Sequence, residues 1–220
     1  MIEIEVADLK VNIAKLNSQY MYIFFKRLFD LCAAILGLIC LSPLFLILAI
    51  CIKLDDPRGT VFYSQIRVGK GEKQFRMYKF RSMVADADKL KKSLTQQNEV
   101  RGAMFKLKND PRITRVGRVI RKYSLDELPQ LMNVVAGSMS LVGPRPPLIT
   151  EVERYTDYDK QRLLVKPGCT GLWQVGGRND VDFDEMVSLD LNYINKRSLF
   201  LDLKIILKTV LVMIKPNGAY

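Results

Sequence analysis

The sequence predicts an α+β protein, mainly helical and monotopic, with one membrane element and one globular domain. Three observations support this class. A long apolar run near the N-terminus is interrupted by Ser42-Pro43, two β-rich runs flank a glycine-rich turn, and apolar residues recur at helical spacing further along the chain. We therefore expect a re-entrant helix kinked at Ser42-Pro43, a small β-hairpin and interfacial amphipathic helices.

The apolar run is the 22-residue stretch from Leu31 to Ile52, which contains no charged residue. An unbroken helix of that length measures roughly 33 Å and would cross a bilayer core of about 30 Å. Pro43 cannot donate to the Ile39 carbonyl, and Ser42 before it is disfavoured in the α region. Each half is then roughly 16 Å long, about half of the hydrocarbon thickness.

Positive charge flanks this run on both sides, at Lys26, Arg27, Lys53, Arg58, Arg67 and Lys70. The positive-inside rule then places both ends in the cytoplasm. A helix that enters to the midplane, bends at Ser42-Pro43 and returns satisfies this rule, with the freed Ile39 carbonyl bonded either by the Ser42 hydroxyl or by neighbouring helices. A spanning helix with a tolerated proline is the alternative. We do not expect a signal peptide, because the run is too long and no A-x-A-like site follows.

Composition restricts the chemistry. The net charge of +11 fits an anionic partner such as lipid headgroups, nucleotide phosphates or nucleic acid. The absence of histidine excludes Ser-His and Cys-His catalysis and His-ligated zinc. The four cysteines have neither metal-ligand nor redox spacing, so we expect free thiols in a reducing compartment. A metal here would be Mg²⁺, held by carboxylates and substrate phosphates.

The chain divides into three parts. Residues 1–24 are a polar tail or short helix, residues 25–54 form the membrane element, and residues 55–220 form the domain at the cytoplasmic face. Within that domain, residues 199–215 are apolar with lysines spaced among them. This pattern is typical of a helix lying in the membrane interface, and a plain core helix is equally compatible.

Two β-rich runs, Thr60–Ser64 and Gln74–Met83, surround Val68-Gly69-Lys70-Gly71 and predict a hairpin. Lys79 and Arg81 share one face of the second strand, because alternate residues of a strand point the same way. Two such cations form either a solvated edge or an anion site. The following segment, Asp86 to Gln97, predicts a charged, exposed helix or lid.

Charged and potentially reactive side chains are most concentrated in the segment from Arg118 to Pro129. Ser124 and Glu127 fit a capping box for a helix that starts at Leu125, although Pro129 also allows the helix to begin there. Asp126 and Glu127 are adjacent carboxylates just downstream of Arg118, Arg121 and Lys122. Nearby cations should keep them ionised, which suits nucleophilic attack or Mg²⁺ binding. Acidic residues at a helix start can also serve stability alone.

Two further segments follow. In Gly143-Pro144-Arg145-Pro146-Pro147, prolines on both sides restrict the backbone around Arg145, either for bidentate phosphate binding or as a rigid surface loop. Lys166 to Arg178 is glycine-rich and holds the only tryptophan. It matches neither the P-loop nor the dinucleotide-binding pattern.

Together these blocks resemble the bacterial sugar transferase family, the monotopic polyprenyl-phosphate glycosyl-1-phosphate transferases. The resemblance runs from about Phe25 to the C-terminus, and its specificity comes from the order of the motifs. They are Lys26-Arg27-Leu28-Phe29-Asp30, Ser42-Pro43, Lys79-Phe80-Arg81-Ser82-Met83, Ser124-Leu125-Asp126-Glu127-Leu128-Pro129-Gln130, Gly143-Pro144-Arg145-Pro146, Lys166-Pro167-Gly168 through Arg178, and the ending Gly218-Ala219-Tyr220.

The resemblance implies a reaction in the bacterial inner membrane, with the active site on the cytoplasmic face. A UDP-sugar donates a sugar phosphate to undecaprenyl phosphate, releasing UMP, at the first membrane step of surface polysaccharide assembly. By resemblance, Asp126 is the nucleophile and Glu127 holds Mg²⁺. The implied substrate-binding residues are Lys79, Arg81, Arg121, Arg145 and Asp190. The resemblance also strengthens the re-entrant interpretation of the apolar run.

Alternatives remain from other classes: a catalytically idle membrane scaffold, an anionic-ligand binding module, and a one-step transfer without a covalent intermediate. We expect no nucleic-acid partner, because aromatic and basic residues are not interleaved. A homodimer stays open, as does the sugar, with a hexose favoured over an N-acetylated amino sugar.

The chain departs from the family pattern in two ways. Ser138 stands in Gly137-Ser138-Met139-Ser140, where the family often has aspartate, which puts a role in loop rigidity in doubt. Only about 24 residues precede the membrane element, as expected for a compact form.

Overall fold

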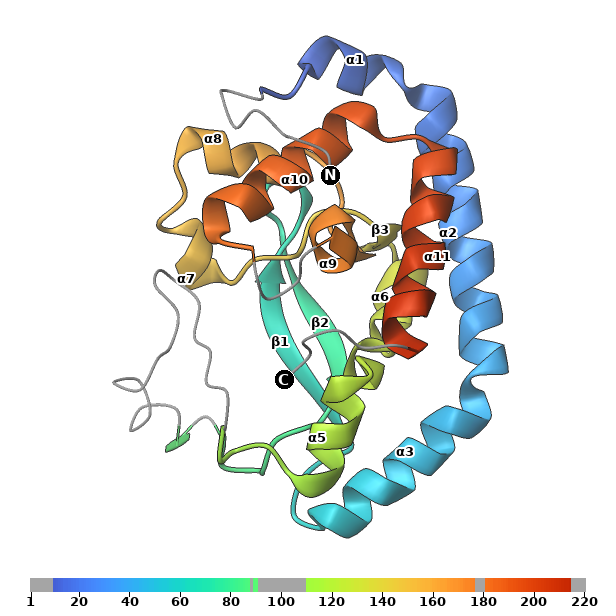
Figure 1. The fold of residues 1–220 in the computed structure, drawn as a ribbon, viewed down its shortest axis with the longest axis vertical. Coiled ribbons are helices and arrows are strands. Elements are labelled where there is room, and N and C mark those ends of the chain that lie inside the picture. The colour runs from blue at the N-terminus through green and yellow to red at the C-terminus, as the bar shows by residue number, and fades with distance from the viewer. Residues whose placement is uncertain (1–9, 88, 91–109, 177–180, 215–220) are drawn as a thin grey trace.

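The computed structural model describes residues 10–87, 89–90, 110–176 and 181–214, and its architecture confirms the mainly helical α+β part of the prediction (Figure 1). The helices are α1 (Ile13–Ser18), α2 (Tyr20–Cys40), α3 (Ser42–Asp55), α5 (Arg115–Lys122), α6 (Gln130–Ala136), α7 (Ile149–Val152), α8 (Asp157–Lys160), α9 (Leu172–Gly176), α10 (Phe183–Lys196) and α11 (Leu199–Ile214). Short 3-10 turns are η1 (Lys70–Glu72), η3 (Leu125–Glu127) and η4 (Gln161–Leu164). The strands are β1 (Phe62–Val68), β2 (Gln74–Phe80), β3 (Ser140–Val142) and β4 (Gly168–Thr170).

Helices α2 and α3 form a bent pair with an angle of 59° between them. The break falls at Leu41, one residue before the predicted position, because Ser42 already belongs to α3 and Pro43 sits in its first turn, where a missing N–H costs no helix bond. The Ser42 hydroxyl donates to the Ile39 carbonyl at 2.8 Å, as the sequence predicted. The pair starts at Tyr20 and ends at Asp55, wider than the predicted range of residues 25–54.

No single helix in the described ranges is long and apolar enough to cross a membrane, whereas α2 and α3 together meet that criterion by length and composition. The pair runs along one edge of the molecule (Figure 1). Only a few of its side chains are buried, among them Ala34, Leu48 and Ile52. Large apolar side chains are exposed along it, including Leu36, Ile39, Leu46, Ile47 and Leu54.

The predicted hairpin is present, with shifted bounds. Strands β1 and β2 are antiparallel, and Phe62 lies opposite Phe80 at one end of the register. Gly71 in the connecting turn has φ of 63°, a conformation that favours glycine. A second, two-stranded sheet pairs β3 with β4 in parallel. The sequence did not predict that pairing, which joins residues almost thirty positions apart.

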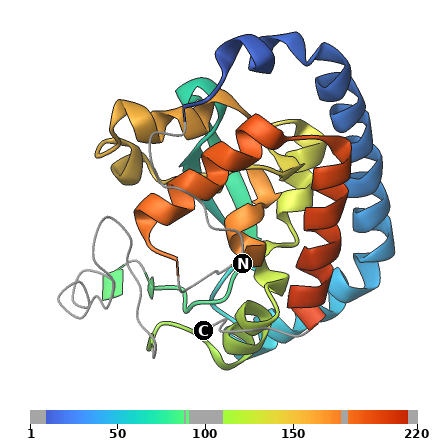
Figure 2. The ribbon, with the colours of Figure 1, turned by 45° about the horizontal axis from the view of Figure 1, so that its top comes forward.

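Helix α11 lies beside α2 (Figures 1 and 2). Its inner face carries the buried residues Asp202 and Ile205. Its outer face exposes large apolar side chains, so α11 is not a core helix enclosed on every side; they are Phe200, Leu203, Leu207, Val210, Leu211 and Ile214. The motif Gly218-Ala219-Tyr220, residues 1–9 and most of the predicted Asp86–Gln97 helix lie outside the described residues.

A buried carboxylate fastens α11 to its neighbours. Asp202, 1% exposed, accepts hydrogen bonds from Tyr22 at 3.0 Å, Lys26 at 2.9 Å and Tyr193 at 2.7 Å. The donors belong to α2 and α10, so one side chain joins three helices. Lys26 also lies 3.8 Å from Asp30, which extends the network along α2.

Two further residues of α2, Asp30 and Arg27, form hydrogen bonds to the rest of the domain. Asp30 accepts hydrogen bonds from the Ser140 hydroxyl at 2.7 Å and the Leu141 backbone N–H at 3.2 Å, both in β3. Arg27 donates to the last carbonyls of α6, those of Val134 and Val135, at 2.6 and 3.0 Å. Residues that flank the apolar run therefore attach it to the domain.

We predict that Asp202→Ala destabilises the protein by about 3–5 kcal/mol, because it removes the buried carboxylate that pairs with the partly buried Lys26 ammonium and accepts hydrogen bonds from Tyr22 and Tyr193. Denaturant unfolding of the detergent-held protein measures the change. Lys204→Ala, at an exposed position of the same helix, is the matched control and should stay within about 0.5 kcal/mol. Equal stability of the two variants would contradict the assigned role of Asp202.

Candidate active site

The predicted carboxylate pair lies on a short turn between two helices. Ser124 has a left-handed backbone with φ of 55° and makes no side-chain capping bond, so the predicted capping box does not form. Asp126 and Glu127 follow in η3, and α6 begins only after Pro129. The helix start at Pro129, the second alternative from the sequence, is therefore the one found, because proline fits the first turn of a helix.

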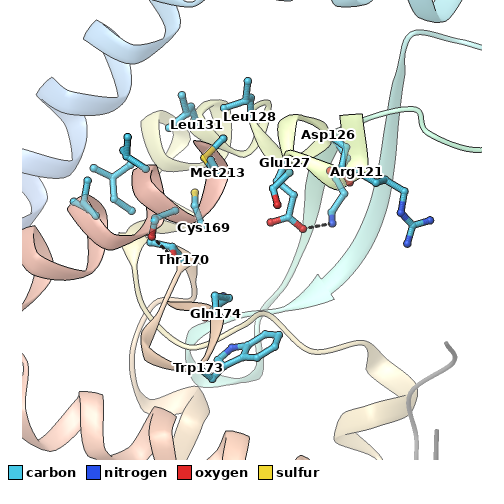
Figure 3. Close-up of a pocket in the computed structure, with 16 residues that line it drawn as sticks. Arg121, Asp126, Glu127, Leu128, Leu131, Cys169, Thr170, Trp173, Gln174 and Met213 are labelled. Carbon is cyan, nitrogen blue, oxygen red and sulfur yellow. Dashed lines mark hydrogen bonds and ion pairs between the residues drawn. The ribbon is translucent and has the colours of Figure 1, made fainter. Parts of the chain in front are cut away.

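Both carboxylates line a pocket of about 400 Å³, within the range of ~300–1,000 Å³ typical of ligand sites (Figure 3). Its polar end contains Lys79, Arg121, Ser124, Asp126 and Glu127. The rest of its lining is mostly apolar, and α11 contributes the largest share with Ile206, Thr209, Val210 and Met213. The other lining residues come from α6, β3, β4, α9 and the turn before α6, and they are Leu131, Leu141, Cys169, Thr170, Trp173, Gln174 and Leu128. The pocket therefore combines a charged end with an apolar wall.

Glu127 is held by Lys79, the predicted anion-binding residue of β2. The Lys79 Nζ lies 2.6 Å from Glu127 Oε1, and the glutamate side chain remains 41% exposed. Partial burial acts to raise the pKa of Glu127, but Lys79, with Arg145 and Arg67 beyond it, outweighs burial and keeps this pKa below its usual range. Glu127 is therefore a stable anion at neutral pH.

Asp126 behaves differently from its neighbour. Burial raises the pKa of Asp126 to about 6; Lys79 opposes this effect, Glu127 adds to it, and Arg121 opposes it more weakly. The carboxyl is thus mostly ionised at neutral pH, as predicted, but burial and not the basic segment dominates its environment. A cation bound nearby would favour the charged form further.

Arg145 lies beyond the pocket lining yet close enough to lower the pKa of Glu127. It is paired with Glu151 at 3.0 Å, and Glu151 also accepts the Leu148 N–H at 2.8 Å. The sequence reasoning did not identify Arg67 for the site. This buried residue donates to the Pro146 carbonyl at 3.1 Å, and burial together with Arg145 lowers the pKa of Arg67 to about 10.

Two predicted substrate-binding residues lie elsewhere. Arg81 follows the end of β2 and donates to Thr60 Oγ1 at 2.8 Å, away from the pocket lining. Asp190, 1% exposed, pairs with Arg162 Nε at 2.8 Å. Burial raises the pKa of Asp190 while Arg162 opposes the shift. The structure therefore places neither Arg81 nor Asp190 in the lining of this pocket.

The proline-arginine loop and the glycine-rich segment form one unit. Gly143 N–H donates to the Thr170 carbonyl, and Gly168 N–H donates to the Pro144 carbonyl, both at 2.9 Å. A Cβ on Gly168 would lie 2.1 Å from the Gly143 nitrogen, so only glycine allows this approach. This contact brings the segment that carries Trp173 beside the loop that carries Arg145.

Ser138, which stands where the family often has aspartate, lies in a hydrogen-bonded turn. Gly137 ends α6 with φ of 83°, and the Ser138 hydroxyl donates to the Asn133 carbonyl at 3.2 Å. Asn133 in turn bonds to β2 through the Arg76 carbonyl at 2.6 Å and the Tyr78 N–H at 3.0 Å. Serine with Asn133 thus fixes this turn where the family often has aspartate.

Metal ligands are few in the described part of the chain, where no group of three or more His, Cys, Asp or Glu side chains could hold an ion. The pocket offers Asp126 and Glu127. Mg²⁺ is commonly held by one or two carboxylates, with water and substrate phosphates completing its shell. The donor set therefore fits Mg²⁺ bound together with a phosphate substrate.

Several lining residues were not predicted as site residues. Trp173 and Gln174 belong to the glycine-rich segment, whose single tryptophan was a usable signal. Ile206, Thr209 and Val210 belong to α11, which packs against α9, β3 and β4 at the pocket. No local pattern in α11 indicates that role.

The fold and pocket define a class of protein in which paired carboxylates and cations lie at one end of an apolar pocket, beside a bent apolar helix pair. A model of the family named bacterial sugar transferase matches residues 21–216. The chain belongs to this family, as the motifs predicted.

Individual relatives agree with the family. The chain is 49% identical over 202 residues to galactosyl transferase CpsE of Streptococcus agalactiae, covering 91% of this chain and 44% of the relative. It is 47% identical over 222 residues to undecaprenyl-phosphate galactose phosphotransferase of Salmonella typhimurium, covering 99% and 45%. It is 44% identical over 199 residues to exopolysaccharide production protein ExoY of Rhizobium meliloti, covering 89% and 88%. The chain thus spans less than half the length of the first two relatives.

We predict that Gly168→Ala disrupts the site, because the added Cβ would overlap the Gly143 backbone. Overpacking of this kind costs about 1–3 kcal/mol and displaces the loop that carries Arg145. Thermal unfolding and donor turnover measure the two effects. Gly176→Ala is the control, since its Cβ would meet nothing within 4 Å. Normal stability and turnover in Gly168→Ala would refute the close approach.

Proposed function

We propose that this protein transfers a sugar phosphate from a UDP-sugar to a polyprenyl phosphate, of which undecaprenyl phosphate is the expected form, releasing UMP. The observation that carries this proposal is the pocket itself. Asp126 and Glu127 lie beside Lys79 and Arg121 at its charged end, while α11 supplies much of an apolar wall. A diphosphate donor needs the first feature and a lipid acceptor needs the second.

The relatives support this reaction class by their names. One is an undecaprenyl-phosphate galactose phosphotransferase, and another, 41% identical, transfers N-acetylgalactosamine phosphate according to its name. Others are named for exopolysaccharide production. For this chain we propose the initiating step of a surface polysaccharide or glycoconjugate. A hexose such as galactose is the favoured sugar, and an N-acetylated amino sugar is the alternative to test.

In the first step, an Asp126 carboxylate oxygen attacks the phosphorus that bears the sugar. The bond from that phosphorus to the bridging oxygen breaks, and UMP leaves with the bonding electrons. Lys79 and Arg121 offset the negative charge of the phosphates, and Arg145 lies close enough to add to this field. Because Asp126 is buried, its carboxylate is weakly solvated and ready to react.

In the second step, an oxygen of the polyprenyl phosphate attacks the same phosphorus. The bond to Asp126 breaks, the carboxylate is restored, and the product is a polyprenyl diphosphosugar. A phosphate bound to a carboxylate is an activated acyl phosphate, so the second attack is favourable. One site can therefore serve the soluble donor and the lipid acceptor in turn.

Mg²⁺ is proposed as the cofactor, and it would supply neutralisation of the phosphate charge. Glu127 is the residue that would hold it. Its Oε1 is bonded to Lys79, which leaves Oε2 for a cation, and its low pKa keeps it an anion. Asp126 lies next to it in η3.

We further propose that the α2–α3 pair dips into the cytoplasmic leaflet of the bacterial inner membrane and returns. Its length, its 59° bend and its exposed apolar surface support this arrangement. Helix α11, with its apolar outer face, would lie in the interface, and the pocket would then open near the headgroups. An acceptor phosphate could approach Asp126 while its chain contacts the apolar wall.

We predict that the purified protein, held in detergent or nanodiscs with Mg²⁺ and undecaprenyl phosphate, releases UMP from one of several UDP-sugars. Asp126→Asn should lower the rate by at least ~10³-fold, because the amide oxygen is a poor nucleophile. Asp184→Asn, at an exposed position of α10, is the matched control and should keep full activity. Chelation of Mg²⁺ with EDTA should stop release, and added Mg²⁺ should restore it.

Other outcomes separate the alternatives. A phosphosugar on the peptide containing Asp126, detected by mass spectrometry when the acceptor is omitted, distinguishes the two-step route from direct transfer. Absence of UMP release from folded protein with every donor would reject the transferase and favour a scaffold or an anionic-ligand binding module.

The proposed re-entrant path predicts that both ends of the helix pair face the cytoplasm. In a cysteine-free background, single cysteines introduced as Ser18→Cys and Arg58→Cys, both at exposed positions, should react with an impermeant thiol reagent from the cytoplasmic side only. Glu153→Cys reports the side of the globular domain. Labelling of Ser18→Cys and Arg58→Cys from opposite sides would establish a spanning helix instead.

A further inference from the structure

The pocket contains the only tryptophan of the chain, Trp173, which the proposed chemistry does not use. It belongs to α9 and stands on the opposite side of the pocket from Asp126 and Glu127, with Gln174 beside it (Figure 3). Its side chain is half-buried, so part of the indole faces the cavity. The site thus has a charged end and, across the cavity from it, a large flat aromatic group.

The backbone that carries Trp173 is held firmly. A Cβ on Gly171 would lie 2.5 Å from the Gly143 carbonyl oxygen, so the start of α9 is pressed against the proline-arginine loop. The Val175 N–H donates back to the Gly171 carbonyl at 3.3 Å. Helix α9 also packs against α10 and α11. The backbone of Trp173 is therefore held in a fixed position relative to the cations of the site.

The indole is not fixed by a hydrogen bond of its own. Its Nε1 is buried and has no hydrogen-bond partner among the described residues. A buried indole N–H usually finds a partner, and leaving it unpaired costs free energy. A purely structural tryptophan would be expected to satisfy this group. An aromatic ring kept at a cavity despite this cost is better explained by what it contacts there.

We propose that Trp173 is the platform on which the nucleobase of the donor stacks. The inference rests on the proposed function, because it takes the donor to be a nucleotide sugar. The sugar is attached to the phosphorus that reacts at Asp126, so it lies near the carboxylates. The base is at the other end of the donor, separated from that phosphorus by a second phosphate and a ribose, and it reaches away from them. The aromatic side chain on the far side of the pocket fits that planar group.

The expected contribution follows from stacking between a base and an aromatic ring, which corresponds to about 5- to 150-fold in affinity. Stacking needs only a flat π-face, so Trp173 would add affinity for the nucleotide without selecting the sugar. Residues nearer Asp126 and Glu127 would then select the sugar.

The single tryptophan allows a direct test on the unmodified protein with Mg²⁺ present. Its fluorescence is excited at the red edge of the indole absorption, where uridine does not absorb. UMP should change the emission saturably, and galactose 1-phosphate, which has a sugar and a phosphate but no base, should not. Emission that responds to galactose 1-phosphate and not to UMP would overturn the proposal and assign the ring to the sugar.

Steady-state kinetics give a second test. Trp173→Ala should raise the KM for the UDP-sugar about 5- to 150-fold and leave the KM for undecaprenyl phosphate and kcat within about twofold. Trp173→Phe, which keeps a smaller ring, should recover most of the loss. The stacking proposal is refuted if Trp173→Ala folds and keeps its KM for the UDP-sugar and UMP also leaves the wild-type emission unchanged. In that case, UMP release by the wild type would still support the transferase. If the wild type releases no UMP, the proposed function fails, and the UMP titration alone decides the platform.

Discussion

The buried carboxylate of Asp202 is the interaction on which the arrangement of this protein depends. It accepts hydrogen bonds from two tyrosines and a lysine on α2 and α10, and so fixes α11 against both helices. Helix α11 supplies much of the apolar wall of the pocket. The same lysine lies near Asp30, which is bonded to β3 and hence to the loop that carries Arg145. A charge enclosed in this way costs too much to leave unpaired, so these elements hold one another in place.

The site shows how unequal pairing with cations separates the pKa values of two adjacent carboxyls. Asp126 is buried, and its pKa rises to about 6, whereas Glu127 is partly exposed, bonded to Lys79 and kept anionic. Repulsion between two neighbouring carboxylates raises the pKa of one of them. The inequality suits a division of roles between nucleophile and metal ligand. Both carboxyls lie in η3, between the left-handed Ser124 and the start of α6 after Pro129.

Charged residues beside the apolar run serve the fold as well as any membrane. Lys26 and Arg27 are bonded to Asp202 and to the end of α6, and Lys53 donates to the carbonyls of Pro57 and Gly59. The cations that flank the apolar run therefore have two possible roles. They attach the run to the domain, and they favour the cytoplasmic side of a membrane. The proposed re-entrant path rests more securely on the bend at Leu41 and on the exposed apolar surface of α2 and α3.

The sequence by itself determined the features that depend on neighbouring residues. The break near Pro43, the bond from Ser42 to Ile39, the hairpin around Gly71 and the family follow from local backbone rules and from the order of motifs. Which charged residues reach the pocket could not be predicted from local patterns, because long-range packing sets it. Arg81 and Asp190 fit a motif but do not line the pocket, whereas the α11 residues line it without a local signature, and Arg67 lies close enough to lower the pKa of Glu127. The reason is physical: a motif fixes a residue type, whereas burial and long-range pairing fix the direction in which its side chain points and the partner it meets.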